Sequence, residues 1–249
     1  MQNAAKCAIA VMAKAPRAGK VKTRLSPPLS PEEATAMSAA FLRDVTENIQ
    51  AAAREAPIAG YVAFAPAGLG HLFDGLLADG TGLLLADGEG EMPPGVDGIG
   101  RSLLHATRAL FAQGFGSVCV LNSDSPTLPT ATLVRAARRL AEPGDHAVLG
   151  PAEDGGYYLL GMKAPHAELY AGMPWSTDRV AQQTRQAARA LGLPLHELDP
   201  WYDVDDRAAL QRLVTEASHP RGQGPAAYPA PATTACLVRL GLPVRLAAA

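Results

Sequence analysis

Residues 7–25 read CAIAVMAKAPRAGKVKTRL, and this stretch decides the fold class. The first seven residues are all apolar, and so short a run followed by a loop favours a strand that is buried on both faces. Residues 14–24 contain five cations together with a proline and a glycine, a composition that is typical of a loop. A buried strand followed by a polar loop and then a helix is the opening unit of an α/β protein.

The rest of the chain continues this alternation of strands and helices. Ser30, Pro31 and Glu33 predict a helix start, because they form a capping box with proline at the first helical position, and apolar residues keep helical spacing up to Ile49. The order predicts one α/β domain with a mostly parallel sheet and helices on both faces, a Rossmann-type arrangement in which ligands bind beyond the carboxyl ends of the strands. The further expected strands are 61–65, 82–86, 117–124, 146–150, 157–162 and 195–198, and the further expected helices are 103–113, 130–141, 177–191 and 206–217.

Composition excludes several classes of protein. The 249 residues are 48% hydrophobic, which is enough for a sizeable core, and a net charge of -2 offers no concentrated positive surface for nucleic acid or an anionic membrane. The 3 cysteines have neither a metal-binding nor a paired spacing, and no apolar run reaches 18 residues. We therefore expect a cytoplasmic protein with neither nucleic acid nor a membrane as its partner.

The C-terminal part of the sequence differs in composition from the rest. Residues 1–217 are predicted to form the domain, and residues 218–249 a Pro/Ala-rich tail. Within it, residues 218–235 contain few large apolar side chains, so we expect this segment to be mobile. Residues 236–246, CLVRLGLPVRL, are apolar enough either to dock back on the domain or to pair with a second copy of the chain in a homodimer.

The basic loop at 14–24 predicts an anion-binding cradle, for which a phosphate chain is the natural guest. It is not a Walker A loop, because GKVKT lacks the glycine four residues before the Gly-Lys pair and Val21 separates Gly-Lys from Lys-Thr. The alternative interpretation is a solvated basic loop without a ligand.

Two acidic positions are candidates for a metal site. Asp124 ends an apolar strand and is followed by Ser125-Pro126, so its carboxylate is expected at the ligand edge of the sheet, where it can hold Mg²⁺. The alternative is an ordinary turn in which Asp124 caps its own backbone. The segment 203–206, DVDD, suggests a second metal contact, or an N-cap for the last helix, or both.

Residues 154–156, Asp-Gly-Gly, lie between two expected strands. Paired glycines let backbone amides approach a ligand closely, and the same residues are also typical of a plain hairpin turn. Trp175 is either a stacking residue or part of the packing of a lid.

Five blocks in this order carry a resemblance to a known family: AKAPRAGKVKTRL, NSDSPTLP, LGPAEDGGYYLLG, MPWST and YDVDD. Together they resemble the uncharacterised, radical-SAM-associated transferases, often named glycosyltransferases, that have the nucleotide-diphospho-sugar transferase fold, a GT-A-like fold. The resemblance runs from residue 8 to about residue 212. The basic loop and the strand-end Asp124 are more distantly similar to the guanylyltransferases that activate phospholactate or molybdopterin.

The resemblance implies a set of site residues. Lys14, Lys22 and Arg24 bind nucleoside phosphates, with Gly19 and Lys20 in the same cradle, and Asp124 and Asp205 bind Mg²⁺ (or Mn²⁺). Lys22, Arg24 and Asp124 are the implied catalytic residues. The implied acceptor side consists of Asp154, Gly155, Gly156 and Trp175.

The expected activity is an Mg²⁺-dependent transfer of a glycosyl or nucleotidyl group from a nucleoside triphosphate or nucleotide sugar to a small-molecule acceptor. Both chemistries remain open, and no nucleophilic side chain is required for either. The alternative is a non-catalytic nucleotide or metabolite sensor on the same fold. The sequence departs from the family pattern at GVDGIGRSLL, where Arg101 is displaced, at Asn122-Ser123-Asp124, and at 206–209, DRAA.

Overall fold

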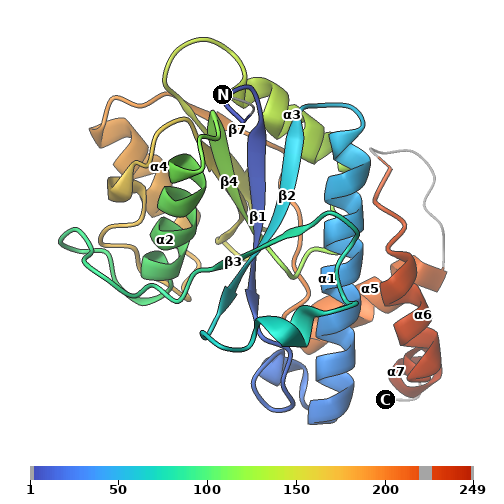
Figure 1. The fold of residues 1–249 in the computed structure, drawn as a ribbon. Helices are drawn as coiled ribbons and strands as arrows, with labels where there is room; N and C mark the ends of the chain where they lie inside the picture. Colours follow the sequence, from blue (N-terminus) through green and yellow to red (C-terminus); the bar gives the residue numbers. More distant parts are fainter. Residues whose placement is uncertain (1–2, 219–225, 248–249) are drawn as a thin grey trace.

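A mixed seven-stranded sheet forms the centre of the computed structural model, which describes residues 3–218 and 226–247 (Figure 1). The strand order across the sheet is β3-β2-β1-β4-β6-β5-β7. The strands are β1 (Cys7–Lys14), β2 (Ile58–Ala65), β3 (Gly82–Leu85), β4 (Ser117–Asn122), β5 (Ala147–Pro151), β6 (Tyr157–Met162) and β7 (Leu195–Glu197).

The sheet is mostly parallel, which confirms the predicted fold class. Strands β1, β2, β3 and β4 are mutually parallel, and β7 is parallel to β5. Strand β6 is the exception, because it is antiparallel to both β4 and β5. The five-residue connection 152–156 explains this direction, since a connection so short can only reverse the chain into a hairpin.

Helices cover both faces of the sheet. They are α1 (Pro31–Ala53), α2 (Gly98–Ala112), α3 (Thr130–Leu140), α4 (Val180–Ala190), α5 (Arg207–Ser218), α6 (Pro231–Arg239) and α7 (Leu242–Ala247), with 3₁₀ turns η1 (Thr23–Leu25), η2 (Gly70–Phe73) and η3 (Ala167–Leu169). The alternation of β1 sets the two faces: Ile9 and Val11 pack against α1 and α3, while Ala8 and Ala10 face α2. No helix in the described ranges is long and apolar enough to cross a bilayer.

The starts of two helices show what local sequence signals can and cannot specify. Helix α1 has the expected capping box, in which Glu33 N donates to Ser30 Oγ (3.2 Å) and Ser30 N donates to Glu33 Oε2 (2.9 Å). Helix α2 begins at Gly98, earlier than the expected 103. A Cβ on Gly100 would lie 3.1 Å from the Tyr170 carbonyl oxygen, so close packing requires glycine at this position. Glycine has a low helix propensity, and the local sequence therefore did not indicate the first turn of α2.

The prediction that residues 218–235 are mobile is wrong for the part of this segment that the structure describes. Helix α6 starts at Pro231 and packs with α7 beside α1. Figure 1 shows α6 and α7 alongside the lower half of α1. The buried Asp44 of α1 accepts hydrogen bonds from Ala232 N (3.0 Å) and Thr233 N (2.6 Å), which ties the start of α6 to the domain. Residues 219–225 lie outside the described residues.

Of the two alternatives for 236–246, the structure has the segment docked on its own domain. Cys236, Leu237, Leu242 and Leu246 are buried in a cluster that also contains residues of α1 and α5. The hydrophobic core therefore extends across the predicted domain boundary at 217. The start of α6 was missed because residues 226–235 are rich in Pro and Ala, and Pro231, which is compatible with a first helical position, was read as part of an irregular segment.

Candidate functional site

Two adjoining cavities lie at the carboxyl edge of the sheet, where ligands bind in folds of this kind. Their volumes are about 530 and 520 Å³. We call the one lined by Lys14, Lys20, Lys22 and Asp205 the basic lobe, and the one lined by Asp154, Asp178 and Asp203 the acidic lobe. Five residues line both lobes and mark their junction: Met12, Arg24, Ile99, Asp124 and Ser176.

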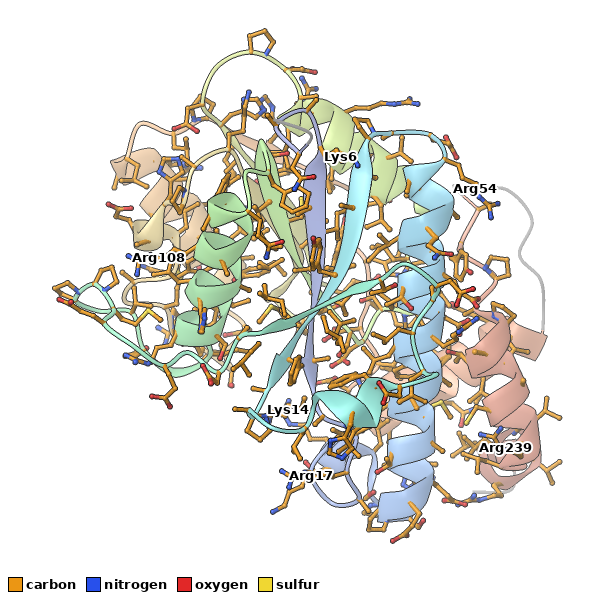
Figure 2. The ribbon with its side chains drawn as sticks, viewed as in Figure 1. Lys6, Lys14, Arg17, Arg54, Arg108 and Arg239 are labelled. Atoms are coloured by element: carbon orange, nitrogen blue, oxygen red, sulfur yellow. The ribbon has the colours of Figure 1, made fainter. Side chains whose placement is uncertain are left out.

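The basic lobe is built from the end of β1 and the loop that follows it. Lys14 and Lys20 are exposed and have no acidic partner among the described residues, so both ammonium groups are available to an anion. Figure 2 shows Lys14 at the lower end of β1 and Arg17 in the loop below it. Gly19 has a φ of 70° with open space around it and lines neither lobe, so it shapes the turn of the loop.

Lys22 differs from the other cations of the loop. Its side chain is only 7% exposed, and its Nζ lies 2.7 Å from Asp124 Oδ1 and 2.7 Å from the Val204 carbonyl oxygen. The same ammonium lies 5.0 Å from the centroid of the Phe41 ring, a cation–π contact. In this arrangement Lys22 neutralises Asp124 and joins it to the segment before α5. Its binding of nucleotide phosphates stays a prediction.

Asp124 and Asp205 reach the basic lobe from distant parts of the sequence. Val204 N donates to the Asp124 carbonyl oxygen (2.8 Å), which connects the end of β4 with the segment before α5. Asp124 Oδ1 also accepts from Ser123 Oγ (2.7 Å), and Asp205 Oδ2 accepts from Arg24 Nη1 (3.0 Å). Asp124 Oδ2 and Asp205 Oδ1 have no partner in the described part of the chain.

These two carboxylates are of the kind that Mg²⁺ binds, and their role as metal ligands stays a prediction. Mg²⁺ in proteins takes one or two carboxylates and completes its shell with phosphate oxygens and water. Within residues 3–218 and 226–247, no group of three or more His, Cys, Asp and Glu side chains is arranged to hold a metal ion. A metal held by Asp124 and Asp205 therefore requires oxygens from a ligand.

Asp203 is an acid of the site that the sequence did not single out from its cluster. Its side chain lines the acidic lobe, and burial together with the charges of Asp154, Asp205 and Asp124 raises its pKa to about 7. The signal was present in the alternation of 203–205, because Val204 is fully buried and its two neighbours must face the other way.

The turn 152–156 shapes the acidic lobe. Asp154 accepts from Gly156 N (2.8 Å), and both residues line the lobe, while their role on the acceptor side stays a prediction. Gly155 does not line it. Its φ is 91°, and a Cβ there would lie 2.1 Å from the Asp178 carbonyl oxygen, so this glycine lets the turn pack against the segment before α4.

Trp175 forms a wall of the acidic lobe and packs across the start of α2. A Cβ on Gly100 would lie 3.0 Å from its indole ring, so this glycine allows the close approach. Ser176 follows with a φ of 63°, an uncommon conformation that places it in both lobes. Arg101 lies elsewhere: it donates to the carbonyl oxygens of Gly88 and Gly90 (both 3.0 Å) and supports the loop before α2.

Comparison with solved structures places the chain in the fold of the nucleotide-diphospho-sugar transferases. A crystal structure from Desulfovibrio desulfuricans G20, provisionally assigned as a nucleotide-diphospho-sugar transferase, matches with a TM-score of 0.77 and 25% identity over 97% of both chains. CMP:2-keto-3-deoxy-manno-octonic acid synthetase complexed with CTP matches with a TM-score of 0.52 and 13% identity over 84% of this chain and 96% of that one. At such identity the second match shows the fold alone.

A third match is 4-diphosphocytidyl-2C-methyl-D-erythritol synthase from Anaerococcus prevotii DSM 20548. Its TM-score is 0.52 at 10% identity, over 86% of this chain and 98% of that one, and it again shows only the fold. No protein of the curated set matches the sequence.

The sequence also matches a family model described as "Uncharacterized protein conserved in bacteria (DUF2064)" over residues 48–177. This range covers just over half of the chain and includes Asp124, Asp154 and Trp175. Together with the structural match from Desulfovibrio desulfuricans, it confirms the resemblance inferred from the five ordered blocks. The chain therefore belongs to the DUF2064 family of uncharacterised proteins conserved in bacteria.

Proposed function

We propose that this protein is a nucleotide-using transferase that depends on Mg²⁺ or Mn²⁺ and moves a glycosyl or nucleotidyl group from a nucleotide sugar or nucleoside triphosphate to a small acceptor. The observation that carries the proposal is the junction of the basic lobe with two carboxylates, Asp124 and Asp205, at the carboxyl edge of the sheet. The assignment of the Desulfovibrio desulfuricans protein, which shares this fold over 97% of its length, supports the same class of reaction.

The basic lobe supplies the charge that a phosphate chain requires. Lys14 and Lys20 are unpaired among the described residues, and Arg24 is 70% exposed although it contacts Asp205. Charge-assisted hydrogen bonds to phosphate oxygens are among the stronger polar contacts in proteins. These three cations are the residues of the loop that we expect to hold the phosphates.

Asp124 and Asp205 would hold the metal, with their unpartnered oxygens turned to it. The metal would neutralise negative charge on the phosphates as the leaving group departs. Lys22 orients Asp124 through its 2.7 Å contact.

The transfer itself needs positioning more than covalent catalysis by the protein. In glycosyl transfer, an acceptor oxygen forms a bond to the sugar carbon while the bond from that carbon to phosphate breaks, and the nucleoside diphosphate leaves with the electron pair. In nucleotidyl transfer, the acceptor oxygen attacks the α-phosphorus and pyrophosphate leaves. In either case an attacking hydroxyl gives its proton to a carboxylate of the acidic lobe or to water.

A binding and turnover screen tests the proposal. Nucleoside triphosphates and nucleotide sugars are titrated by calorimetry with and without Mg²⁺, and the reaction mixture is analysed for nucleoside diphosphate and pyrophosphate. We expect at least one nucleotide to bind only with the metal, and Asp124→Asn to abolish this dependence. Asp79→Asn, on the surface outside both lobes, is the matched control.

The two products separate glycosyl from nucleotidyl transfer. Binding without turnover of any nucleotide would support the alternative of a sensor, and the absence of any nucleotide binding would contradict the proposal.

A further inference from the structure

We propose that the acidic lobe binds an acceptor that carries hydroxyl or amine groups and no phosphate or carboxylate. This inference rests on the proposed function, since only a transferase has an acceptor. It deepens that function by naming the chemical class of the molecule that receives the transferred group. It is carried by the charge of the lobe and by its apolar wall.

The charge of the lobe is negative. Its ionisable lining consists of Asp124, Asp154, Asp178, Asp203 and a single cation, Arg24. Arg24 contacts Asp205 and is assigned above to the phosphates of the nucleotide, and Asp124 is paired with Lys22, so with the basic lobe occupied neither ion pair leaves a cation for a ligand of this lobe. Three acids, Asp154, Asp178 and Asp203, therefore face the cavity without a cationic partner among the described residues, and Asp203, with a pKa of about 7, carries only part of a negative charge at neutral pH.

A negative cavity of this kind discriminates against anions. Like charges that face each other in an interface strongly lower the binding affinity, and a phosphate ester brings up to two negative charges. Hydroxyl and ammonium hydrogens, in contrast, are donors that carboxylates accept readily. The lobe thus favours neutral or cationic donors of hydrogen bonds.

The wall of the lobe is suited to the carbon skeleton of such a molecule. Leu103, Val120 and Val180 supply an apolar surface. Asn122 Oδ1, Tyr157 Oη and Trp175 Nε1 lie in the same wall, buried and without a hydrogen-bond partner among the described residues. These three atoms have almost no accessible surface, so a ligand of the lobe contacts the rings and the apolar side chains of the wall rather than these atoms.

The opposite charges of the two lobes also orient the reactants. The phosphates of the nucleotide belong in the basic lobe, and the acceptor belongs in the acidic lobe, so the reacting atoms meet at the shared residues Ile99, Asp124 and Ser176. The attacking group is then a hydroxyl or amine. Its oxygen or nitrogen bonds to the electrophilic atom of the donor, the phosphate leaving group takes the electron pair, and the proton passes to a lobe carboxylate or to water.

Intrinsic fluorescence can report on this lobe directly. The chain has two tryptophans, Trp175 and Trp201, so Trp201→Phe leaves Trp175 as a single probe in the wall. The variant is titrated with glucose, glucosamine and glucose 6-phosphate in a buffer with excess inorganic phosphate, which occupies the cations of the basic lobe. We expect saturable changes with glucose or glucosamine and a dissociation constant about 100-fold higher, or no binding, for the phosphate ester. Glucose and glucosamine separate neutral from cationic acceptors.

Charge reversal supplies the second arm. Asp178→Lys in the same background replaces an exposed acid of the lobe by a cation. We expect it to lower the ratio of the dissociation constants of glucose 6-phosphate and glucose by about tenfold. Asp74→Lys makes the same change on the exposed end of η2, outside both lobes, and should leave the preference within about twofold.

The outcomes separate this inference from the proposed function. Equal or tighter binding of glucose 6-phosphate, an unaltered preference in Asp178→Lys, or no response of Trp175 to any of the three compounds overturns the inference. Calorimetry with nucleotides and Mg²⁺ on the same variant tests the proposed function separately. Failure there, with glucose or glucosamine still bound, refutes nucleotide use and leaves the chemistry of the acidic lobe standing.

Discussion

Replacing Lys22 by methionine tests whether this side chain holds the two halves of the site together. Methionine keeps the apolar stem and removes an ammonium that lies 2.7 Å from both Asp124 Oδ1 and the Val204 carbonyl oxygen. Loss of one partner from a fully buried ion pair costs about 3–5 kcal/mol. The side chain of Asp124 is 30% exposed, so water recovers part of this energy. We expect Lys22→Met to lower the free energy of unfolding by about 2–3 kcal/mol.

Urea denaturation measures this change, and a double-mutant cycle assigns it to the ion pair. For a chain of this length the loss corresponds to a fall in Tm of roughly 5–10 °C. Lys20→Met is the matched control, because Lys20 is an exposed lysine of the same loop and should change stability by less than about 0.5 kcal/mol. Combined with Asp124→Asn, Lys22→Met should show a coupling energy of at least about 1 kcal/mol.

The reasoning is refuted if Lys22→Met costs no more than Lys20→Met, or if the effects of Lys22→Met and Asp124→Asn are additive. The same variant tests the predicted phosphate role of Lys22, when nucleotide affinity is measured well below its Tm. An affinity close to that of the original protein would show that Lys22 acts only on Asp124. A loss that persists when Lys22→Met is made in the Asp124→Asn background would show that it also contacts phosphates.

Three further substitutions or truncations are expected to have distinct effects. Arg24→Ala should weaken nucleotide binding by about 1.5–3 kcal/mol in calorimetry with little change in Tm, because its exposed guanidinium contributes a charge-assisted bond and little packing. Gly155→Ala should cost at least about 2 kcal/mol more in urea denaturation than Gly144→Ala, since both glycines have φ near 90° but only Gly155 meets a neighbouring backbone. Ending the chain at Ala217 should lower Tm by more than about 10 °C in a thermal melt, because it exposes the apolar α1 surface and removes two hydrogen-bond donors from Asp44; an unchanged Tm would contradict the docking of α6.

Local signals were sufficient where a single segment determines its own structure. The apolar run at 7–13 became β1, and the capping box at Ser30 became the start of α1, because both depend on residues within a few positions of one another. The predictions that failed concern segments whose structure depends on packing against residues far away in the sequence. The first turn of α2 contains glycines selected by Trp175, and α6 depends on Asp44, which lies far away in the sequence.

The candidate site shows the same division. Composition and position along the strands placed Lys14, Lys20, Asp124 and Asp205 at one edge, and the structure has all four lining the basic lobe. No local pattern could distinguish Lys22 from the other four cations of the loop. Its distinct environment comes from Phe41, Asp124 and Val204, which meet it only in the folded chain.

The segment 202–205 explains how acids come to face both lobes. Tyr202 and Val204 are 4% and 0% exposed and pack in the cluster formed with α1 and α5. Because side chains alternate along extended backbone, Asp203 and Asp205 must then point out of that cluster, and they line the acidic and the basic lobe respectively. Val204 N and its carbonyl oxygen fix the segment to Asp124 and Lys22. The positions of the acids are thus set by the burial of two apolar side chains that touch neither cavity, so the α5 side of the core supports the geometry of the site.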